Sequence, residues 1–320
     1  MKIVVLDGHT LNPGDNPWDG VAAQGELTVH ERTPRDEIVR RAADAEIVLT
    51  NKTPLSRETL LVLPKLKFIS VLATGHNIVD GAAARERDIP VSNVPSYGTD
   101  SVAQHTIALL LELCHRVGEH DQSVHAGDWC RSTDFCYWKS PQRQLTGQTL
   151  GVIGFGRIGR RVTEIGRALG MDIVYWRKPG STHPPADNAR GVDLDELCRV
   201  ADVITLHCAL TPQNTGFVNR EFLARLKPSA LLINTARGAL VHETDLADAL
   251  RAGTLGGAAL DVLSQEPPPA NHPLLAAPRC VITPHLAWTS LTARRNLMRT
   301  TEENIRAFLE HAPRNVVNGL

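Results

Sequence analysis

The stretch GVIGFGRIGRRVTEI, residues 151–165, decides the fold of this chain. It begins as an apolar, strand-like run, passes through Gly154, Gly156 and Gly159, and continues with helical periodicity. In a G-x-G-x-x-G pattern the first glycine permits a tight turn and the second lets the backbone approach a pyrophosphate. The third lets the helix pack closely on the strand. The helix N-terminus adds unpaired N–H groups and a partial positive charge, so we expect a dinucleotide-binding turn here.

Strands and helices alternate on both sides of this turn, which predicts an α/β fold with parallel sheets. In the first hundred residues we expect strands at 2–6, 46–50, 67–73 and 89–93. From Thr149 onward we expect six strands, at 149–155, 172–176, 202–208, 230–236, 256–263 and 280–284. The helices between them are expected to begin near Arg157, Asp193, Asn219, His242 and Ser290. The fold class is thus two Rossmann-like doubly wound domains, the larger inserted into the smaller.

Between the two series lies a long helical segment. Residues 99–127 carry apolar side chains at helical spacing, which predicts one long helix with Thr99 or Ser101 as its N-cap. The loop that follows, residues 128–144, is dense in aromatic residues although only 4% of the chain is aromatic. Clustered exposed aromatic side chains mark interfaces, so we expect this segment to contact a partner.

The composition excludes several classes of protein. The net charge is −1, which indicates no bulk attraction to nucleic acid or to an anionic membrane. No apolar stretch is long enough to span a bilayer, and the N-terminus lacks the pattern of a signal peptide. The six cysteines form no C-x-x-C pair, so we expect reduced thiols, no metal site and a cytoplasmic location.

The strand at 172–176 ends where a cofactor is selected. NAD-binding sites usually carry an acidic residue there, which holds the ribose 2′-hydroxyl. This chain has Arg177 and Lys178 instead. Arginine pairs with a phosphate through two hydrogen bonds, so we expect NADP as the preferred cofactor, with NAD as the alternative. The other interpretation is a solvated basic turn.

Three side chains past the ends of later strands predict hydride-transfer chemistry. Arg237, Glu266 and His285 each follow a strand at the carboxyl edge of the sheet, where doubly wound folds bind ligands. A histidine can protonate a carbonyl oxygen near neutral pH, and a neighbouring carboxylate stabilises and orients its ring. A guanidinium can hold a substrate carboxylate and polarise the carbonyl. Taken singly, Arg237 is more typical of a surface or cap residue and Glu266 of an exposed one, and His285 alone is as typical of a satisfied polar residue as of a functional one.

Several motifs in order resemble one family over essentially the whole chain. GVIGFGRIGRR, LLINTARGALV, GAALDVLSQEPP and VITPHLAW, with VLATGHNIVD upstream, resemble the D-isomer-specific 2-hydroxyacid dehydrogenases. The likeness is strongest to the branch of glycerate dehydrogenases and hydroxypyruvate or glyoxylate reductases. It implies a flavodoxin-like substrate domain, residues 1–98 and 289–320, and a dinucleotide-binding domain, residues 99–288, whose segment 99–146 makes a homodimer contact.

The resemblance also implies residue roles. Arg237, Glu266 and His285 match the catalytic residues. The implied cofactor contacts are Gly154, Gly156, Arg157, Ile158, Gly159, Arg177, His207, Pro212, Thr235, Ala236, Arg237, Asp261 and His285. The implied substrate contacts are Lys52, Thr74, Gly75, His76, Arg237 and Trp288. The alternative for Lys52 and His76 is that their side chains point into solvent. Trp138 either reaches the active site of the partner subunit or packs at the dimer interface of its own subunit.

The expected activity is reversible hydride transfer between the nicotinamide and a small 2-oxo acid, with glyoxylate or hydroxypyruvate favoured. Two alternatives stay open. One is a non-catalytic dinucleotide-sensing regulator on the same fold, and the other is a phosphoglycerate dehydrogenase.

Overall fold

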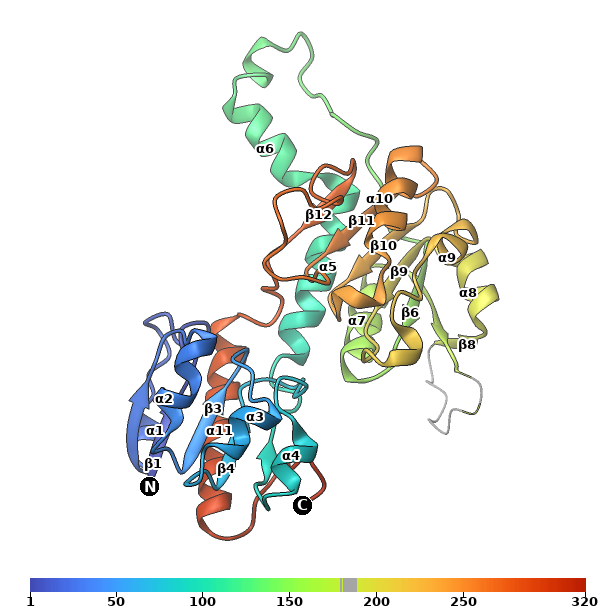
Figure 1. Cartoon of the computed structure of the whole chain (residues 1–320). Coiled ribbons are helices and arrows are strands. Elements are labelled where there is room, and N and C mark those ends of the chain that lie inside the picture. The colour runs from blue at the N-terminus through green and yellow to red at the C-terminus, as the bar shows by residue number, and fades with distance from the viewer. Residues whose placement is uncertain (179, 181–188) are drawn as a thin grey trace. The chain divides into compact units, whose positions relative to one another are not determined.

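The computed structural model describes residues 1–178, 180 and 189–320. This part of the chain divides into two compact units (Figure 1). Unit 1 combines Met1–Gly98 with Trp288–Leu320, and unit 2 is the continuous segment Thr99–Ala287. The boundary falls one residue before the predicted one, so Trp288 belongs to unit 1.

Unit 1 is built on a five-stranded parallel sheet with the order β2-β1-β3-β4-β5. Its strands are β1 (Lys2–Val5), β2 (Glu26–Val29), β3 (Ile47–Thr50), β4 (Phe68–Val71) and β5 (Val91–Ser92). Its helices are α1 (Asp19–Ala22), α2 (Ile38–Ala42), α3 (Arg57–Leu61), α4 (Gly81–Arg85) and α11 (Leu291–Leu309). The order 2-1-3-4-5 is the flavodoxin-like order, which confirms the predicted fold of this part.

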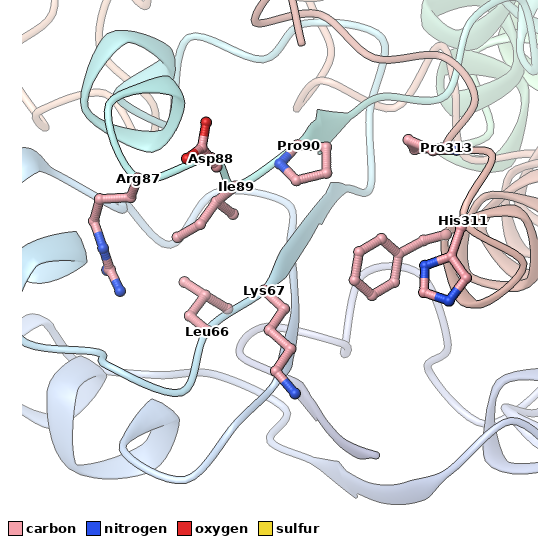
Figure 2. Close-up of a pocket in the computed structure, with 9 residues that line it drawn as sticks. Leu66, Lys67, Arg87, Asp88, Ile89, Pro90, His311 and Pro313 are labelled. Carbon is pink, nitrogen blue, oxygen red and sulfur yellow. The ribbon is translucent and has the colours of Figure 1, made fainter.

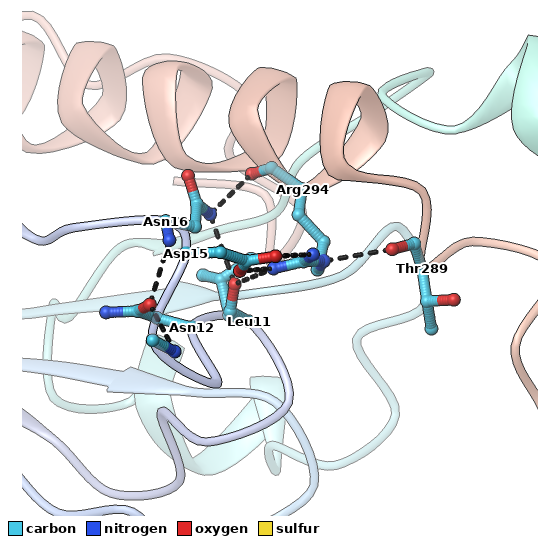
Figure 3. Close-up of polar contacts among 7 residues, drawn as sticks. Leu11, Asn12, Asp15, Asn16, Thr289 and Arg294 are labelled. Atoms are coloured by element: carbon cyan, nitrogen blue, oxygen red, sulfur yellow. Dashed lines mark hydrogen bonds and ion pairs between the residues drawn. The ribbon is translucent and has the colours of Figure 1, made fainter.

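The helix α11 is anchored by a buried arginine (Figure 3). The Arg294 guanidinium donates to the Leu11 carbonyl at 3.2 Å and to the Thr289 carbonyl at 2.9 Å, and it forms a two-bonded ion pair with Asp15. The side-chain amide of Asn16 donates to the carbonyls of Leu11 and Arg294. One side chain thus ties the start of α11 to the loop after β1.

Unit 2 contains a seven-stranded parallel sheet with the order β12-β11-β10-β9-β6-β7-β8. Its strands are β6 (Thr149–Ile153), β7 (Asp172–Trp176), β8 (Arg190–Val192), β9 (Val203–Leu206), β10 (Leu231–Asn234), β11 (Gly257–Leu260) and β12 (Cys280–Ile282). Numbered within the unit, this is the dinucleotide-binding order 3-2-1-4-5-6 with one further strand at the edge. The doubly wound prediction is confirmed, but the count of six strands was wrong because β8 was missed.

Helices cover both faces of this sheet. On one face lie α5 (Thr99–His115) and α7 (Arg157–Ala168), whose apolar residues share a core with β6, β7 and β10. On the other face lie α8 (Leu194–Val200), α9 (Arg220–Ala224) and α10 (Glu243–Ala252). The sheet is therefore buried on both sides, which explains its nearly continuous apolar strands. No helix in the described residues has the length and apolar character of a membrane span.

The predicted single helix over 99–127 is wrong. Arg116 adopts a left-handed conformation with φ of 46°, which ends α5 and starts α6 (Val117–His125) in a new direction (Figure 1). The helix α5 begins at Thr99, and Ser101 lies inside its first turn rather than at an N-cap. The Ser101 hydroxyl instead donates to the carbonyl of Ala287 at 2.6 Å.

Candidate active site

The glycine turn after β6 has the shape that a dinucleotide requires. Gly154 has φ of 100°, and a Cβ there would lie 2.3 Å from the backbone nitrogen of Cys208. A Cβ on Gly159 would lie 2.3 Å from the Gly154 carbonyl oxygen, so the helix packs directly on the turn. A Cβ on Gly156 would meet nothing within 4 Å, which leaves open space over the N-terminus of α7. These residues fit a nicotinamide dinucleotide, with Arg157 and Ile158 as the first two residues of α7.

The segment after β9 lies beside this turn. The backbone N–H of His207 donates to the Ile153 carbonyl at 2.7 Å. Its Nε2 is buried and has no hydrogen-bond partner among the described residues. Burial lowers the pKa of His207 to about 3, so the ring is neutral in the folded chain at neutral pH. Pro212 opens an exposed turn, η3 (Pro212–Asn214), just beyond it.

Arg177 and Lys178 are exposed directly after β7. The Arg177 backbone N–H donates to the Val192 carbonyl at 2.9 Å, which pairs the end of β7 with β8. The backbone of Arg177 is therefore held while its side chain faces solvent at the edge where an acidic residue would stand in an NAD site.

The turn after β10 is fixed by a buried amide. The Asn234 side chain is fully buried, accepts from the Ala236 N–H at 3.0 Å and donates to the Arg237 carbonyl at 2.9 Å. Thr235 is buried and its hydroxyl contacts that of Thr106 on α5 at 2.9 Å. Arg237 itself is exposed, and its guanidinium donates to the Ala236 carbonyl at 2.6 Å.

The turns after β10 and β11 are in direct contact. A Cβ on Gly238 would lie 1.9 Å from the carbonyl carbon of Leu263, so only glycine fits between them. This packing places the segment of Arg237 against the segment that leads to Glu266.

Glu266 and His285 form a hydrogen-bonded pair. The Glu266 carboxylate lies 2.6 Å from Nδ1 of His285, and its other oxygen accepts from the Leu263 N–H at 3.0 Å. The two side chains are 33% and 27% exposed, so the pair is shielded but reachable. His285 has φ of 53°, an uncommon conformation for a residue other than glycine.

Asp261 holds the turn that carries His285. Its buried carboxylate accepts from the Leu286 and Ala287 N–H groups, both at 2.9 Å, and from the Thr283 hydroxyl at 2.6 Å. Its backbone carbonyl accepts from the His285 N–H at 2.8 Å. Burial alone would raise the pKa of Asp261, but the bonds from His105, Thr283 and the two N–H groups outweigh burial and lower it.

The predicted substrate residues of unit 1 follow β3 and β4. The Asp7 carboxylate accepts from the N–H groups of Asn51, Lys52 and Thr53, which shapes the turn after β3. The Thr74 hydroxyl donates to the Val94 carbonyl at 2.9 Å. Gly75 is half-buried, whereas the side chains of Lys52 and His76 are exposed.

Trp288 is half-buried in unit 1 and packs edge-on against Tyr97, with ring centroids 6.2 Å apart. A hollow of about 420 Å³ lies elsewhere in this unit (Figure 2). It is lined by Leu66, Lys67, Arg87, Asp88, Ile89, Pro90, Phe308, His311 and Pro313. Because Lys67 and Pro90 precede β4 and β5, the hollow lies at the amino edge of the sheet, opposite to Thr74.

Sequence reasoning missed the residues that hold these turns. Asn234 and Gly238 lie beside Arg237 in LLINTARGALV, but that stretch assigned no role to them, and Asp7 lies in none of the quoted motifs. A polar residue ending a buried strand was a usable signal for Asn234 and Asp7. Among the described residues, no group of three His, Cys, Asp or Glu side chains is arranged to hold a metal ion.

Comparisons with known proteins agree with this geometry. The family model described as D-isomer specific 2-hydroxyacid dehydrogenase, NAD binding domain, matches residues 107–287. The chain is 47% identical to a hydroxypyruvate reductase of Blautia hydrogenotrophica, over 99% of this chain and 100% of the relative. It is 41% identical to a glycerate dehydrogenase of Methylorubrum extorquens, over 99% and 98%.

Among solved structures, an acyclic imino acid reductase in complex with NADPH and D-Arg superposes with a TM-score of 0.86 at 28% identity. The alignment covers 99% of this chain and 100% of that one.

Proposed function

Because this chain belongs to the D-isomer specific 2-hydroxyacid dehydrogenase family, we propose that it reduces hydroxypyruvate or glyoxylate, with His285 as the proton donor. As a member of that family it is an oxidoreductase of 2-hydroxy acids that uses a nicotinamide dinucleotide. The observation that carries the proposal is the 2.6 Å contact between Glu266 and His285.

The geometry of this pair supports His285 as the proton donor. Nδ1 of His285 donates to the Glu266 carboxylate, so Nε2 is the ring nitrogen that gives its proton to the substrate oxygen. The bound nicotinamide supplies the hydride to the carbonyl carbon. The carboxylate orients the ring through the transfer. In the oxidative direction His285 takes the proton back.

Arg237 is the substrate anchor in this proposal. Its guanidinium is exposed and stands on a turn that Asn234 fixes on both sides. An arginine so placed can bind a carboxylate through two hydrogen bonds and polarise the adjacent carbonyl. Thr74, Gly75 and His76 are proposed to complete the carboxylate site, with Lys52 and Trp288 as further substrate contacts.

We propose NADP as the preferred cofactor, supported by two cations in place of the usual acid. Arg177 is exposed and its backbone is held by Val192, and Lys178 adds a second positive charge. A 2′-phosphate would gain charge-assisted hydrogen bonds there, whereas a ribose hydroxyl would lose its usual acidic partner.

A homodimer is also proposed, supported by exposed apolar side chains on α6 of unit 2 and on the loop that follows it. Val117, Trp129, Phe135 and Trp138 are exposed on α6 and the following loop, and Phe135 is 88% exposed. Such a cluster is typical of an interface. Light scattering should find a dimer that Trp138→Asp weakens.

The proposed function is tested with a panel of 2-oxo acids measured with NADPH and with NADH. We expect the highest kcat/KM with hydroxypyruvate or glyoxylate and with NADPH. Phosphoglycerate dehydrogenase activity would appear instead as preferred turnover of the phosphorylated 2-oxo acid. Cofactor binding without turnover of any 2-oxo acid would indicate the regulator.

A further inference from the structure

The helix α5 contacts the turn that carries His285 through two side chains. Ser101 and His105 are four residues apart, so they lie on one face of the helix. The Ser101 hydroxyl donates to the Ala287 carbonyl at 2.6 Å. Nε2 of the half-buried His105 lies 3.0 Å from the Thr283 hydroxyl and 3.5 Å from the Asp261 carboxylate. Both contacts fall on residues that flank His285.

The hydrogen bonds of Thr283 define the direction of this chain of contacts. The Thr283 hydroxyl donates its hydrogen bond to the Asp261 carboxylate at 2.6 Å. Its oxygen can therefore only accept a hydrogen bond from His105. Nε2 of His105 is therefore the donor. The carboxylate at the end of the chain is the group that accepts from the Leu286 and Ala287 N–H groups. His105 thus acts on the His285 turn through Thr283 and Asp261.

The next residue of α5 holds the neighbouring turn. The buried Thr106 hydroxyl donates to the Val102 carbonyl at 2.8 Å and so accepts from the Thr235 hydroxyl. Thr235 lies two residues before Arg237. One helix therefore contacts the turns of both reactive side chains, after β10 and after β12.

We propose that His105 is a positioning residue for catalysis: its Nε2–H holds Thr283 and Asp261 so that the turn keeps His285 in line for proton transfer. The inference rests on the proposed role of His285. It assigns no contact between His105 and substrate or cofactor. The strained φ of 53° at His285 explains why the turn needs this support, since such a conformation persists only when its surroundings hold it.

The first experiment compares His105→Leu, His105→Gln and the control Gln104→Ala. Leucine removes the donor, whereas glutamine places an amide N–H near the position of Nε2. Gln104 is the exposed neighbour on the same helix. We expect His105→Leu to lower kcat about tenfold, the size expected for one lost hydrogen bond, with little change in KM. His105→Gln should restore most of kcat, and Gln104→Ala should match the wild type.

A second pair of variants tests the path through the hydroxyl. Thr283→Val removes the hydroxyl that connects His105 to Asp261, and Thr283→Ser keeps this hydroxyl. Thr283→Val should reproduce the loss in kcat, and the double variant with His105→Leu should be no worse than either single variant. Fully additive losses would overturn the proposed chain of contacts.

The measurement that is independent of turnover is amide hydrogen exchange at Leu286 and Ala287. Faster exchange there in His105→Leu, with thermal unfolding unchanged, is the expected result. Unchanged exchange, or faster exchange with an unchanged kcat, would overturn the positioning role. If the wild type reduces no 2-oxo acid, the proposed function fails, while the exchange data still decide whether His105 holds the turn.

Discussion

At the scale of single residues, the pair of Glu266 and His285 makes the most specific statement about chemistry. The carboxylate lies 2.6 Å from Nδ1, and the ring is held on a turn of unusual backbone conformation. A carboxylate in this position fixes the orientation of the ring that the proposed proton transfer needs.

Glu266→Gln should therefore lower kcat for reduction. The amide keeps the size of the side chain but replaces a charged hydrogen-bond acceptor at Nδ1 of His285 by a neutral group, which holds the ring less firmly. The measurement is kcat for the 2-oxo acid, with binding of the reduced cofactor as the control. An unchanged kcat would show that the two groups do not act together.

Arg177→Asp should reverse the cofactor preference. An exposed charge-assisted contact contributes about 1–3 kcal/mol, so we expect the wild type to prefer NADPH by roughly tenfold to a hundredfold. The aspartate would repel a 2′-phosphate and accept from a ribose hydroxyl, mainly changing KM for the cofactor. Measured kcat/KM for both cofactors decides this, and a wild type that prefers NADH would contradict it.

The glycines and the residues that hold the turns show what the sequence can and cannot reveal at this scale. Gly154, Gly156 and Gly159 were identifiable because their spacing has a known physical reason. Asn234 and Gly238 lie in LLINTARGALV, but their roles were not identifiable, because they depend on the geometry of the turn and on the contact of Gly238 with Leu263.

At the scale of elements, the apolar strands were predictable, including the edge strands β5 and β12, and the exposed edge strands β2 and β8 were not. The segment 172–176 was predicted with its exact bounds because β7 is apolar and bounded by polar residues. β2 and β8 lie at sheet edges and are largely exposed, so they lack the apolar pattern on which the prediction relied. The break at Arg116 was not predicted because apolar residues continue across it without proline, and Gly118 lies inside α6 rather than at the break.

The anchor of α11 gives a prediction at this scale. Arg294→Leu should lower the thermal midpoint by several degrees, because it removes the buried hydrogen bonds from Arg294 to the carbonyls of Leu11 and Thr289 and the ion pair with Asp15. Arg299→Leu, on the exposed face of the same helix, is the matched control and should have little effect. Equal midpoints for both variants would contradict the anchoring role (Figure 3).

At the scale of the whole molecule, we expect the stability of the folded chain to depend on pH through the buried ring of His207. His207 has its pKa lowered from 6.5 to about 3 by burial. Between these values the unfolded chain binds a proton that the folded chain excludes, so stability is lost as pH falls through this window.

His207→Gln should therefore lose less stability than the wild type when urea unfolding is compared near neutral pH and at about pH 5. Glutamine keeps a polar side chain but does not titrate. Parallel losses in the two proteins would show that His207 takes up its proton in the folded state.

Single-turnover reduction of hydroxypyruvate by the wild type and by His285→Ala tests most directly whether His285 protonates the substrate. General-acid catalysis contributes about a hundredfold or more, so the variant should be slower by at least that factor. Its affinity for the reduced cofactor, measured by fluorescence titration, should stay close to that of the wild type. A variant that binds the cofactor normally and reduces hydroxypyruvate at nearly the wild-type rate would show that His285 is not the proton donor.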